Sequence, residues 1–193
     1  MKKVTCVVVG DAGVGKSTII TQLTQSVFEE DYKPTVEDEA TFPLLVGDHD
    51  VELTIYDTSG NVEFARMRED KYKLGEGFLA VYSITSDESF KELKTILDKL
   101  KALKENTVPI VLVGCKLDSD EQRQVTTEQG AEMAKLLNCP FAEINAKERD
   151  HVVDVFTRLV REIERISSQH KVETTPAAAA KGKPKKKKCC TVL

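Results

Sequence analysis

The sequence predicts an open α/β sheet of six strands, mostly parallel, with one antiparallel edge strand and helices on both faces. Short apolar segments rich in β-branched residues alternate along the chain with longer segments in which apolar residues recur at helical spacing. Two strand-like segments follow each other directly across the turn 47–50, which predicts an antiparallel hairpin. Pro43 lies in the first of them and indicates an edge strand, because proline lacks a backbone donor.

The individual elements follow from the same patterns in chain order. The clearest helix starts at residue 87, where leucines recur at helical spacing and where Thr85 with Glu88 fits a capping box. Ligands of such sheets bind at the carboxyl ends of the strands, so the site is expected there. The expected strands cover residues 3–9, 38–46, 51–57, 77–83, 110–115 and 140–144, and the expected helices cover residues 16–25, 65–74, 87–104, 127–138 and 151–168.

Charge is distributed unevenly along the chain. Residues 171–193 carry seven lysines and one glutamate, a net charge of +6, which leaves −10 for residues 1–170. An acidic domain argues against a nucleic-acid partner, whereas the basic segment favours an anionic surface. The composition beyond about Gln169 cannot bury a core. We therefore expect one domain over 1–168 and a disordered polybasic tail over 169–193.

No apolar run approaches the roughly 20 residues that span a bilayer. The five cysteines form neither a metal-ligand spacing nor an even-numbered disulfide framework. A reducing, cytosolic environment is the simplest interpretation of that pattern.

Residues 10–17 read G-D-A-G-V-G-K-S and match the pattern G-x-x-x-x-G-K-[ST] in full. The segment follows an expected strand and leads into an expected helix, which is the context that a phosphate-binding loop requires. Its glycines let backbone N–H groups turn toward a di- or triphosphate, while Lys16 reaches the β and γ phosphates and Ser17 binds Mg²⁺. We expect nucleotide contacts from Gly10, Ala12, Gly13, Val14, Gly15, Lys16, Ser17 and Thr18.

A second motif, D-T-S-G at residues 57–60, closes the third expected strand. Asp57 is placed to hold Mg²⁺ through water, and Gly60 lets a backbone N–H approach a γ-phosphate. An Asp and a Gly at a strand end are also common turn residues, so the motif alone is weak evidence. It indicates a nucleotide site because a phosphate-binding loop precedes it by about 40 residues.

Two further loops follow the fifth and sixth expected strands. In C-K-L-D at 115–118, the Asp118 carboxylate is suited to accept from guanine N1 and N2, with the Lys116 stem along the base. Taken alone, an ordinary charged loop explains this segment equally well. In N-A-K at 145–147, the Ala146 backbone N–H is suited to contact guanine O6.

These four motifs, in this order, resemble the Ras branch of the small GTPases over residues 1 to about 168. The resemblance implies a P-loop NTPase G domain that binds GTP or GDP with Mg²⁺ and hydrolyses GTP slowly. It also implies that Thr35 binds Mg²⁺ and senses the γ-phosphate, and that Phe28 packs on the guanine edge. The segment 82–85 looks more like the Rap subgroup than Ras itself. Further implied nucleotide contacts are Cys115, Asn145 and Lys147.

The resemblance further implies partners. Residues 32–38 look like the family's first switch, and the segment from Gly60 to about Tyr72 would be the second. Effector proteins with Ras-binding domains, exchange factors and GTPase-activating proteins (GAPs) would act on a monomer, and no nucleic acid is expected. Glu37 and Asp38 begin the edge strand, where they would bind an effector; the alternative interpretation is that they form an ordinary solvated acidic face. The expected effector-binding residues are Tyr32, Pro34, Val36, Glu37 and Asp38.

Four residues depart from the family pattern. Asn61 stands for the usual water-positioning glutamine, and Ala12 stands for a glycine beside the γ-phosphate. Cys115 stands for an asparagine that ties the base-binding loop together, and Asn145 for a serine. The expected catalytic residues are Lys16, Thr35, Gly60 and Asn61.

These departures keep a second hypothesis open. The chain would then be a hydrolysis-impaired adaptor that stays GTP-bound or binds nucleotide weakly. An ATP-using kinase is disfavoured by Asp118, because adenine offers no matching donor pair.

The segment C-T-V-L at 190–193 fits the C-a-a-X prenylation pattern, and its final Leu favours a geranylgeranyl group on Cys190. Six lysines within 181–188 supply the second signal that stable anchoring needs, through anionic inner-leaflet lipids. A nuclear localisation signal is the rival interpretation of the lysines, and Cys189 is a candidate for palmitoylation. We expect a lipid-anchored protein on the cytoplasmic side of the plasma membrane or an endomembrane.

Overall fold

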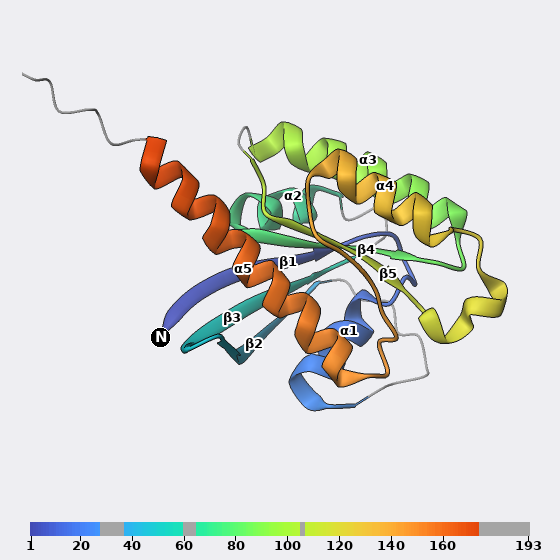
Figure 1. The fold of residues 1–193 in the computed structure, drawn as a ribbon, viewed down its shortest axis with the longest axis horizontal. Helices are drawn as coiled ribbons and strands as arrows, with labels where there is room; N and C mark the ends of the chain where they lie inside the picture. The colour runs from blue at the N-terminus through green and yellow to red at the C-terminus, as the bar shows by residue number, and fades with distance from the viewer. Residues whose placement is uncertain (28–36, 60–64, 105–106, 174–193) are drawn as a thin grey trace, which may run out of the picture.

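In the computed structural model, which describes residues 1–27, 37–59, 65–104 and 107–173, the strands form one sheet in the order β2-β3-β1-β4-β5-β6 (Figure 1). All neighbouring strands are parallel except the pair β2 and β3, which is antiparallel. The predicted mixed sheet, its hairpin and the edge position of β2 are therefore confirmed. The strands are β1 Lys2–Val9, β2 Glu37–Val46, β3 His49–Thr58, β4 Gly77–Ser83, β5 Ile110–Cys115 and β6 Phe141–Glu143.

The burial of each strand explains its sequence. All residues of β4 and β5 are buried, as expected for central parallel strands that are covered on both faces and read as continuous apolar runs. In β3, Val51, Leu53 and Ile55 are buried, while the residues between them are half-exposed. That alternation is typical of a strand with one face on the core.

Helices cover both faces of the sheet, as predicted. On one face, α1 (Lys16–Gln25) and α5 (Arg149–Glu173) contribute Ile19, Leu23, Phe156 and Leu159 to a core with β1 and β3. On the other, α2 (Ala65–Leu74), α3 (Asp87–Lys104) and α4 (Thr127–Leu137) form a second core with β4 and β5 (Figure 1). Within the described ranges, no helix has the length and apolar character needed to cross a membrane.

The start of α3 differs from the prediction. The expected capping box of Thr85 and Glu88 is wrong, because Ser86 accepts from the Ser89 backbone N–H over 3.1 Å and so caps the helix. Thr85 instead lies 2.8 Å from the Ser83 hydroxyl. A complete capping box is found one helix later, on α4, where Thr126 and Gln129 hold each other's backbone N–H groups.

The last helix, α5, begins at Arg149 and ends at Glu173, so it is longer at both ends than the expected 151–168. It passes residue 168, where the sequence placed the end of the domain. Residues 174–193, most of the predicted tail, lie outside the described residues.

Two glycines make room for the largest fully buried side chain. Tyr82 packs edge-on against Phe90, with ring centroids 4.8 Å apart. A Cβ atom on Gly114 would lie 2.9 Å from the Tyr82 hydroxyl, and a Cβ on Gly130 would lie 2.5 Å from it. A Cβ on Gly130 would also lie 2.5 Å from the Phe141 ring. The contact between α4 and the sheet therefore depends on Gly130.

We expect Gly130→Ala to destabilise the protein by about 1–3 kcal/mol, because the new methyl group overpacks a full core. Helix propensity alone predicts the opposite change, an increase of about 1 kcal/mol in the free energy of unfolding. Urea unfolding of both proteins under identical conditions measures the difference. Glu132→Ala, at an exposed position of the same helix, is the control and should change stability by less than about 0.5 kcal/mol. A Gly130→Ala protein more stable than the wild type would contradict the packing argument.

Candidate functional site

The predicted motifs meet at one edge of the sheet, because they follow the carboxyl ends of parallel strands. Residues 10–17 follow β1, Asp57 lies at the end of β3, and residues 115–118 and 145–147 follow β5 and β6. In an open α/β sheet this edge is the usual ligand-binding edge. Seven of the predicted site residues lie in 28–36 or 60–64, outside the described residues: Phe28, Tyr32, Pro34, Thr35, Val36, Gly60 and Asn61.

The loop at 10–17 passes too close to its neighbours for side chains at two positions. A Cβ atom on Gly10 would lie 2.2 Å from the Val81 carbonyl oxygen, and one on Gly15 would lie 2.9 Å from the Cys115 sulfur. Gly13 and Gly15 also have positive φ angles of 70° and 108°, which favour glycine. The loop is therefore a backbone-lined cradle, which fits a phosphate chain that is bound by N–H groups.

Helix α1 starts directly at the end of this cradle. Gly15 precedes the helix in a left-handed conformation and provides no side-chain cap. The N–H groups of the first turn and the helix dipole are thus directed at whatever the loop holds, which favours an anion. Ser17 and Thr18 lie half-buried in this first turn.

Lys16 brings a cation into the cradle. Its side chain is only 6% exposed, and its ammonium group donates to the Asp11 carbonyl oxygen over 2.6 Å. The Asp11 carboxylate accepts from the Ala12 backbone N–H over 2.7 Å and so shapes the loop from outside. Ala12 itself is exposed. The buried ammonium and the helix start together provide positive potential for a polyphosphate.

Asp57 provides an acid beside this cradle. The residue is 4% exposed and pairs in register with Val8 of β1, one residue before the strand leads into the loop. Next to it, the Thr58 hydroxyl donates to the Val8 carbonyl oxygen over 2.7 Å, which fixes the strand end. The hard oxygens of Asp57 and Ser17 suit Mg²⁺. The third predicted ligand, Thr35, lies outside the described ranges.

The loops after β5 and β6 are bonded to each other. The Asp118 carboxylate and the Lys147 ammonium group lie 2.9 Å apart. The Leu117 backbone N–H donates to the Ile144 carbonyl oxygen over 3.1 Å. Asn145 accepts from the Lys147 backbone N–H over 3.0 Å. The residues predicted to read a base are therefore one connected unit.

Sequence reasoning missed two of these contacts. The ion pair between Lys147 and Asp118 puts a cation on the carboxylate that was expected to accept from guanine. Gln22 of α1 is also involved, because its amide donates to the Lys147 carbonyl oxygen over 2.8 Å. No local motif marks Gln22, since its contact lies 125 residues away in sequence.

Cys115 lies where three loops meet. Its side chain is buried, touches the Gly15 position and faces the loops that start at Lys116 and at Ala146. Burial raises the pKa of the Cys115 thiol to about 11, although hydrogen bonds from the Lys116 and Ala146 backbone N–H groups act in the opposite direction. The group is a neutral thiol at physiological pH, and a thiol is a weak donor and a weak acceptor.

The predicted effector residues are described only in part. Glu37 and Asp38 begin β2, the edge strand, where they pair with Thr58 and Asp57 of β3. Asp38 is exposed, and so is Glu39 beside it. Pro43 lies farther along the same edge, opposite Glu52. The start of β2 is therefore acidic and exposed at Asp38 and Glu39, next to the Asp57 side of the site.

Comparisons with known proteins agree with this arrangement. The family model described as Ras family matches residues 5–165, a range that contains all four motifs. Ras-like protein rasS of Dictyostelium discoideum is 41% identical over 188 residues, which covers 97% of each chain. Ras-like protein 1 of Saccharomyces cerevisiae is 44% identical over 156 residues, which covers 80% of this chain and 50% of the yeast protein.

We expect Cys115→Asn to slow the release of bound GDP, because an amide can hold the Lys116 and Ala146 N–H groups and donate toward the loop at Gly15. One neutral hydrogen bond contributes about 0.5–1.5 kcal/mol, so each added bond should slow release about 2- to 10-fold. Release of a fluorescent GDP analogue into excess unlabelled GDP measures the rate. Cys115→Ala is the control for size and should not slow release. Equal rates in the Asn and Ala variants would contradict the role of hydrogen bonding at this junction.

Proposed function

The chain belongs to the Ras family of small GTPases, and we propose that it is a Ras/Rap-like signalling switch that cycles between GTP-bound and GDP-bound states at a membrane. Members of this family bind GTP and GDP and hydrolyse GTP, and they work with regulators and effectors. The observation that carries the proposal is the glycine-lined cradle before α1, with buried Lys16 in it and buried Asp57 beside it. This arrangement suits a polyphosphate with a divalent cation.

We assign the phosphate contacts to the cradle. The backbone of residues 13–17 would hold the phosphate oxygens, and the Lys16 ammonium group would exchange its Asp11 carbonyl partner for the β and γ phosphates. Ser17, Thr35 and Asp57 are the residues that would hold Mg²⁺, which is typical of the family. When bound, the ion neutralises charge on the transferred phosphoryl group.

We assign guanine recognition to the connected loops after β5 and β6. Asp118 would accept from the base, which requires that Lys147 share or leave this carboxylate. The Ala146 backbone N–H would meet the base oxygen, and the Lys116 stem would lie along the base plane. Gln22 supports the assignment, because it ties the Lys147 carbonyl to the same helix that begins at the phosphates.

Hydrolysis is expected to be slow. Asn61 is one methylene shorter than glutamine, so its amide would fall about an ångström short of the attacking water, and misplacement of that size costs about 100-fold. The Ala12 methyl group would crowd the same region and an incoming arginine from a GAP. Relatives of the Rap type also lack this glutamine, and a GAP supplies the amide, so slow unaided turnover is compatible with a switch.

Effector binding would follow the nucleotide state. Thr35 and Gly60 would hold their two loops only while the γ-phosphate is present, and β2 begins where the first loop ends. The exposed acidic start of β2, at Asp38 and Glu39, suits strand addition by a basic effector domain. The adaptor alternative is not favoured by the family match, although Ala12, Asn61 and Cys115 keep it testable.

We expect protein purified without added nucleotide to release GDP when it is denatured, because the site reads guanine and completes hydrolysis. Chromatography of the released nucleotide measures this. GTP in place of GDP would favour the adaptor, and the absence of guanine nucleotide would contradict the proposed function.

The paired substitution Ala12→Gly with Asn61→Gln should raise single-turnover hydrolysis about 10- to 100-fold if geometry limits the rate. Asn138→Gln, at an exposed position after α4, is the control.

We also propose that the tail anchors the protein. The segment C-T-V-L at 190–193 fits prenylation of Cys190, and the six lysines within 181–188 would each add about 1 kcal/mol near an anionic leaflet. One lipid chain alone gives marginal, reversible binding, so the lysines act as the second signal. A palmitoyl group on Cys189 would strengthen the same attachment.

We expect Cys190→Ser to move the protein from the membrane fraction to the soluble fraction, because the only acceptor for a prenyl group in the pattern is lost. Fractionation of cells that express the full chain measures the shift. Cys139→Ser removes a cysteine outside the pattern and should leave the distribution unchanged. Unchanged membrane attachment of Cys190→Ser would contradict the prenylation proposal.

A further inference from the structure

The Arg123 guanidinium group joins the segment after β5 to strand β6. Its Nη1 and Nη2 atoms donate to the two carboxylate oxygens of Glu143, over 2.7 Å and 3.0 Å. Its Nε atom donates to Asp120 over 2.6 Å, and Nη1 also donates to the Val125 carbonyl oxygen over 3.1 Å. The Arg123 side chain is 19% exposed and that of Glu143 is 10% exposed. This is a largely buried, bidentate (two-pronged) ion pair, which is the strong form of a charge-assisted hydrogen bond.

On one side, the pair holds the segment that carries Asp118. A short 3-10 helix, η2 (Leu117–Gln122), contains Asp118 and ends one residue before Arg123. The backbone N–H groups of Gln124 and Val125 both donate to the Ile84 carbonyl oxygen, over 2.8 Å and 3.0 Å. The far end of the segment is thus fixed to the end of β4, and Arg123 fixes it sideways to β6.

On the other side, the pair holds the segment that carries Ala146. Glu143 is the last residue of β6 and precedes Ala146 by three residues. Its carboxylate also accepts from the Thr127 hydroxyl of α4 over 3.0 Å. Glu143 lies opposite Gly114 of β5, where a Cβ atom would meet its Cγ at 3.1 Å. The position of Glu143 is therefore fixed from three directions.

We propose that Arg123 is a positioning residue for guanine recognition, which sets the separation of Asp118 and Ala146 through Glu143. The inference rests on the proposed function of these two residues. A base bound between them must meet an acceptor on one side and a donor on the other at the same time. The two loops are also linked directly, by the neutral hydrogen bond from Leu117 to Ile144 and by the Lys147–Asp118 ion pair. Both side chains of that ion pair are more exposed, at 47% and 30%, than those of Arg123 and Glu143, so the bidentate Arg123–Glu143 pair is the better shielded connection.

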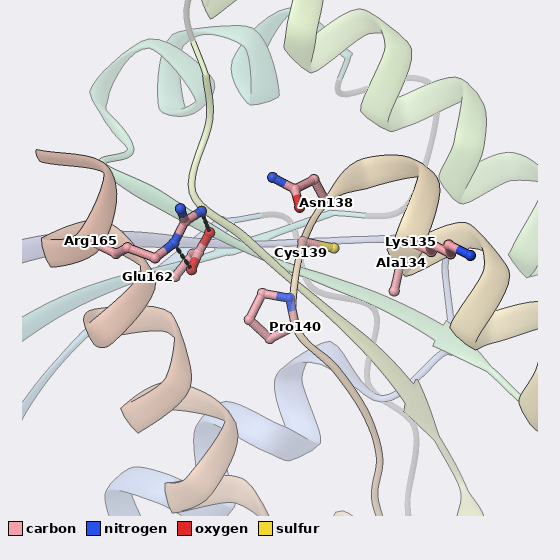
Figure 2. A pocket seen from close by; sticks show the side chains of 7 residues that line it. All are labelled: Ala134, Lys135, Asn138, Cys139, Pro140, Glu162 and Arg165. Atoms are coloured by element: carbon pink, nitrogen blue, oxygen red, sulfur yellow. Dashed lines mark hydrogen bonds and ion pairs between the residues drawn. The ribbon is translucent and has the colours of Figure 1, made fainter. Parts of the chain in front are cut away.

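The chain contains a matched ion pair away from the site. Arg165 and Glu162 of α5 also form a two-pronged contact, here through Nε and Nη2 of the arginine, with Glu162 8% and Arg165 44% exposed. Figure 2 shows this pair at the wall of a pocket of about 290 Å³ between α4 and α5. Pro140, which precedes β6, lies in the same pocket, so the pair lies toward the amino end of the strand whose carboxyl end carries Glu143. Arg165→Lys is therefore the control for Arg123→Lys.

The test compares GDP with inosine diphosphate, which lacks the exocyclic amino group of guanine. Arg123→Lys keeps the charge and removes the two-pronged geometry. We expect it to speed GDP release about tenfold and to reduce the preference for GDP over inosine diphosphate about tenfold, a step of 1.4 kcal/mol each. Competition against a fluorescent GDP analogue measures both quantities. Arg165→Lys should leave both unchanged.

A merely structural role would lower the melting temperature of both variants without changing the preference between the two nucleotides. An unchanged preference in folded Arg123→Lys, or an equal change in Arg165→Lys, would overturn the proposal. If Arg123→Lys does not fold, Glu143→Gln replaces it in the same comparison, with Glu162→Gln as its control. Failure of the proposed function is a separate result, since the wild type would then show no preference for guanine nucleotides over ATP.

Discussion

The path of the phosphate-binding loop is fixed by two close approaches that leave no room for side chains. Gly10 lies against the Val81 carbonyl and Gly15 against the Cys115 sulfur, so the loop is held by β4 on one side and by the end of β5 on the other. The start of α1, the inward turn of Lys16 and the distance to the base-reading loops all follow from this position. A methyl group at either glycine would displace the loop as a whole, because one neighbour is backbone and the other is a buried side chain.

One consequence of this constraint is that two charged groups of the site are buried. Lys16 and Asp57 are both nearly excluded from water. Burying charged groups costs desolvation free energy, which the partners of each group offset. A bound polyphosphate with its cation would add further partners for both groups. Stability and nucleotide occupancy should therefore be linked, as they are whenever a ligand binds only the folded state.

Most of the fold could be predicted because its determinants are local. Apolar runs, helical spacing, the turn 47–50 and Pro43 together specify the element order and the edge strand, and the loop at 10–17 identifies its own context. The errors arose where neighbouring residues compete, as at the start of α3, where Ser86 and not Thr85 provides the cap. In the site, the position of each motif after the carboxyl end of a strand predicted that the four motifs would meet at one edge of the sheet. The contacts of Gln22 and Arg123 could not be predicted, since their partners lie 125 and 20 residues away and carry no shared pattern.

Helix α5 has a mechanical consequence for how the two oppositely charged parts of the chain behave. It starts at Arg149, just after the base-reading loop, and its 25 residues span roughly 37 Å. Electrostatic screening at physiological ionic strength acts over about 8 Å. The helix is thus a spacer several screening lengths long, so charged groups at its two ends are screened from each other. If the proposed anchor follows residue 173, the helix would put up to its own length between the attachment point and the base-reading loops.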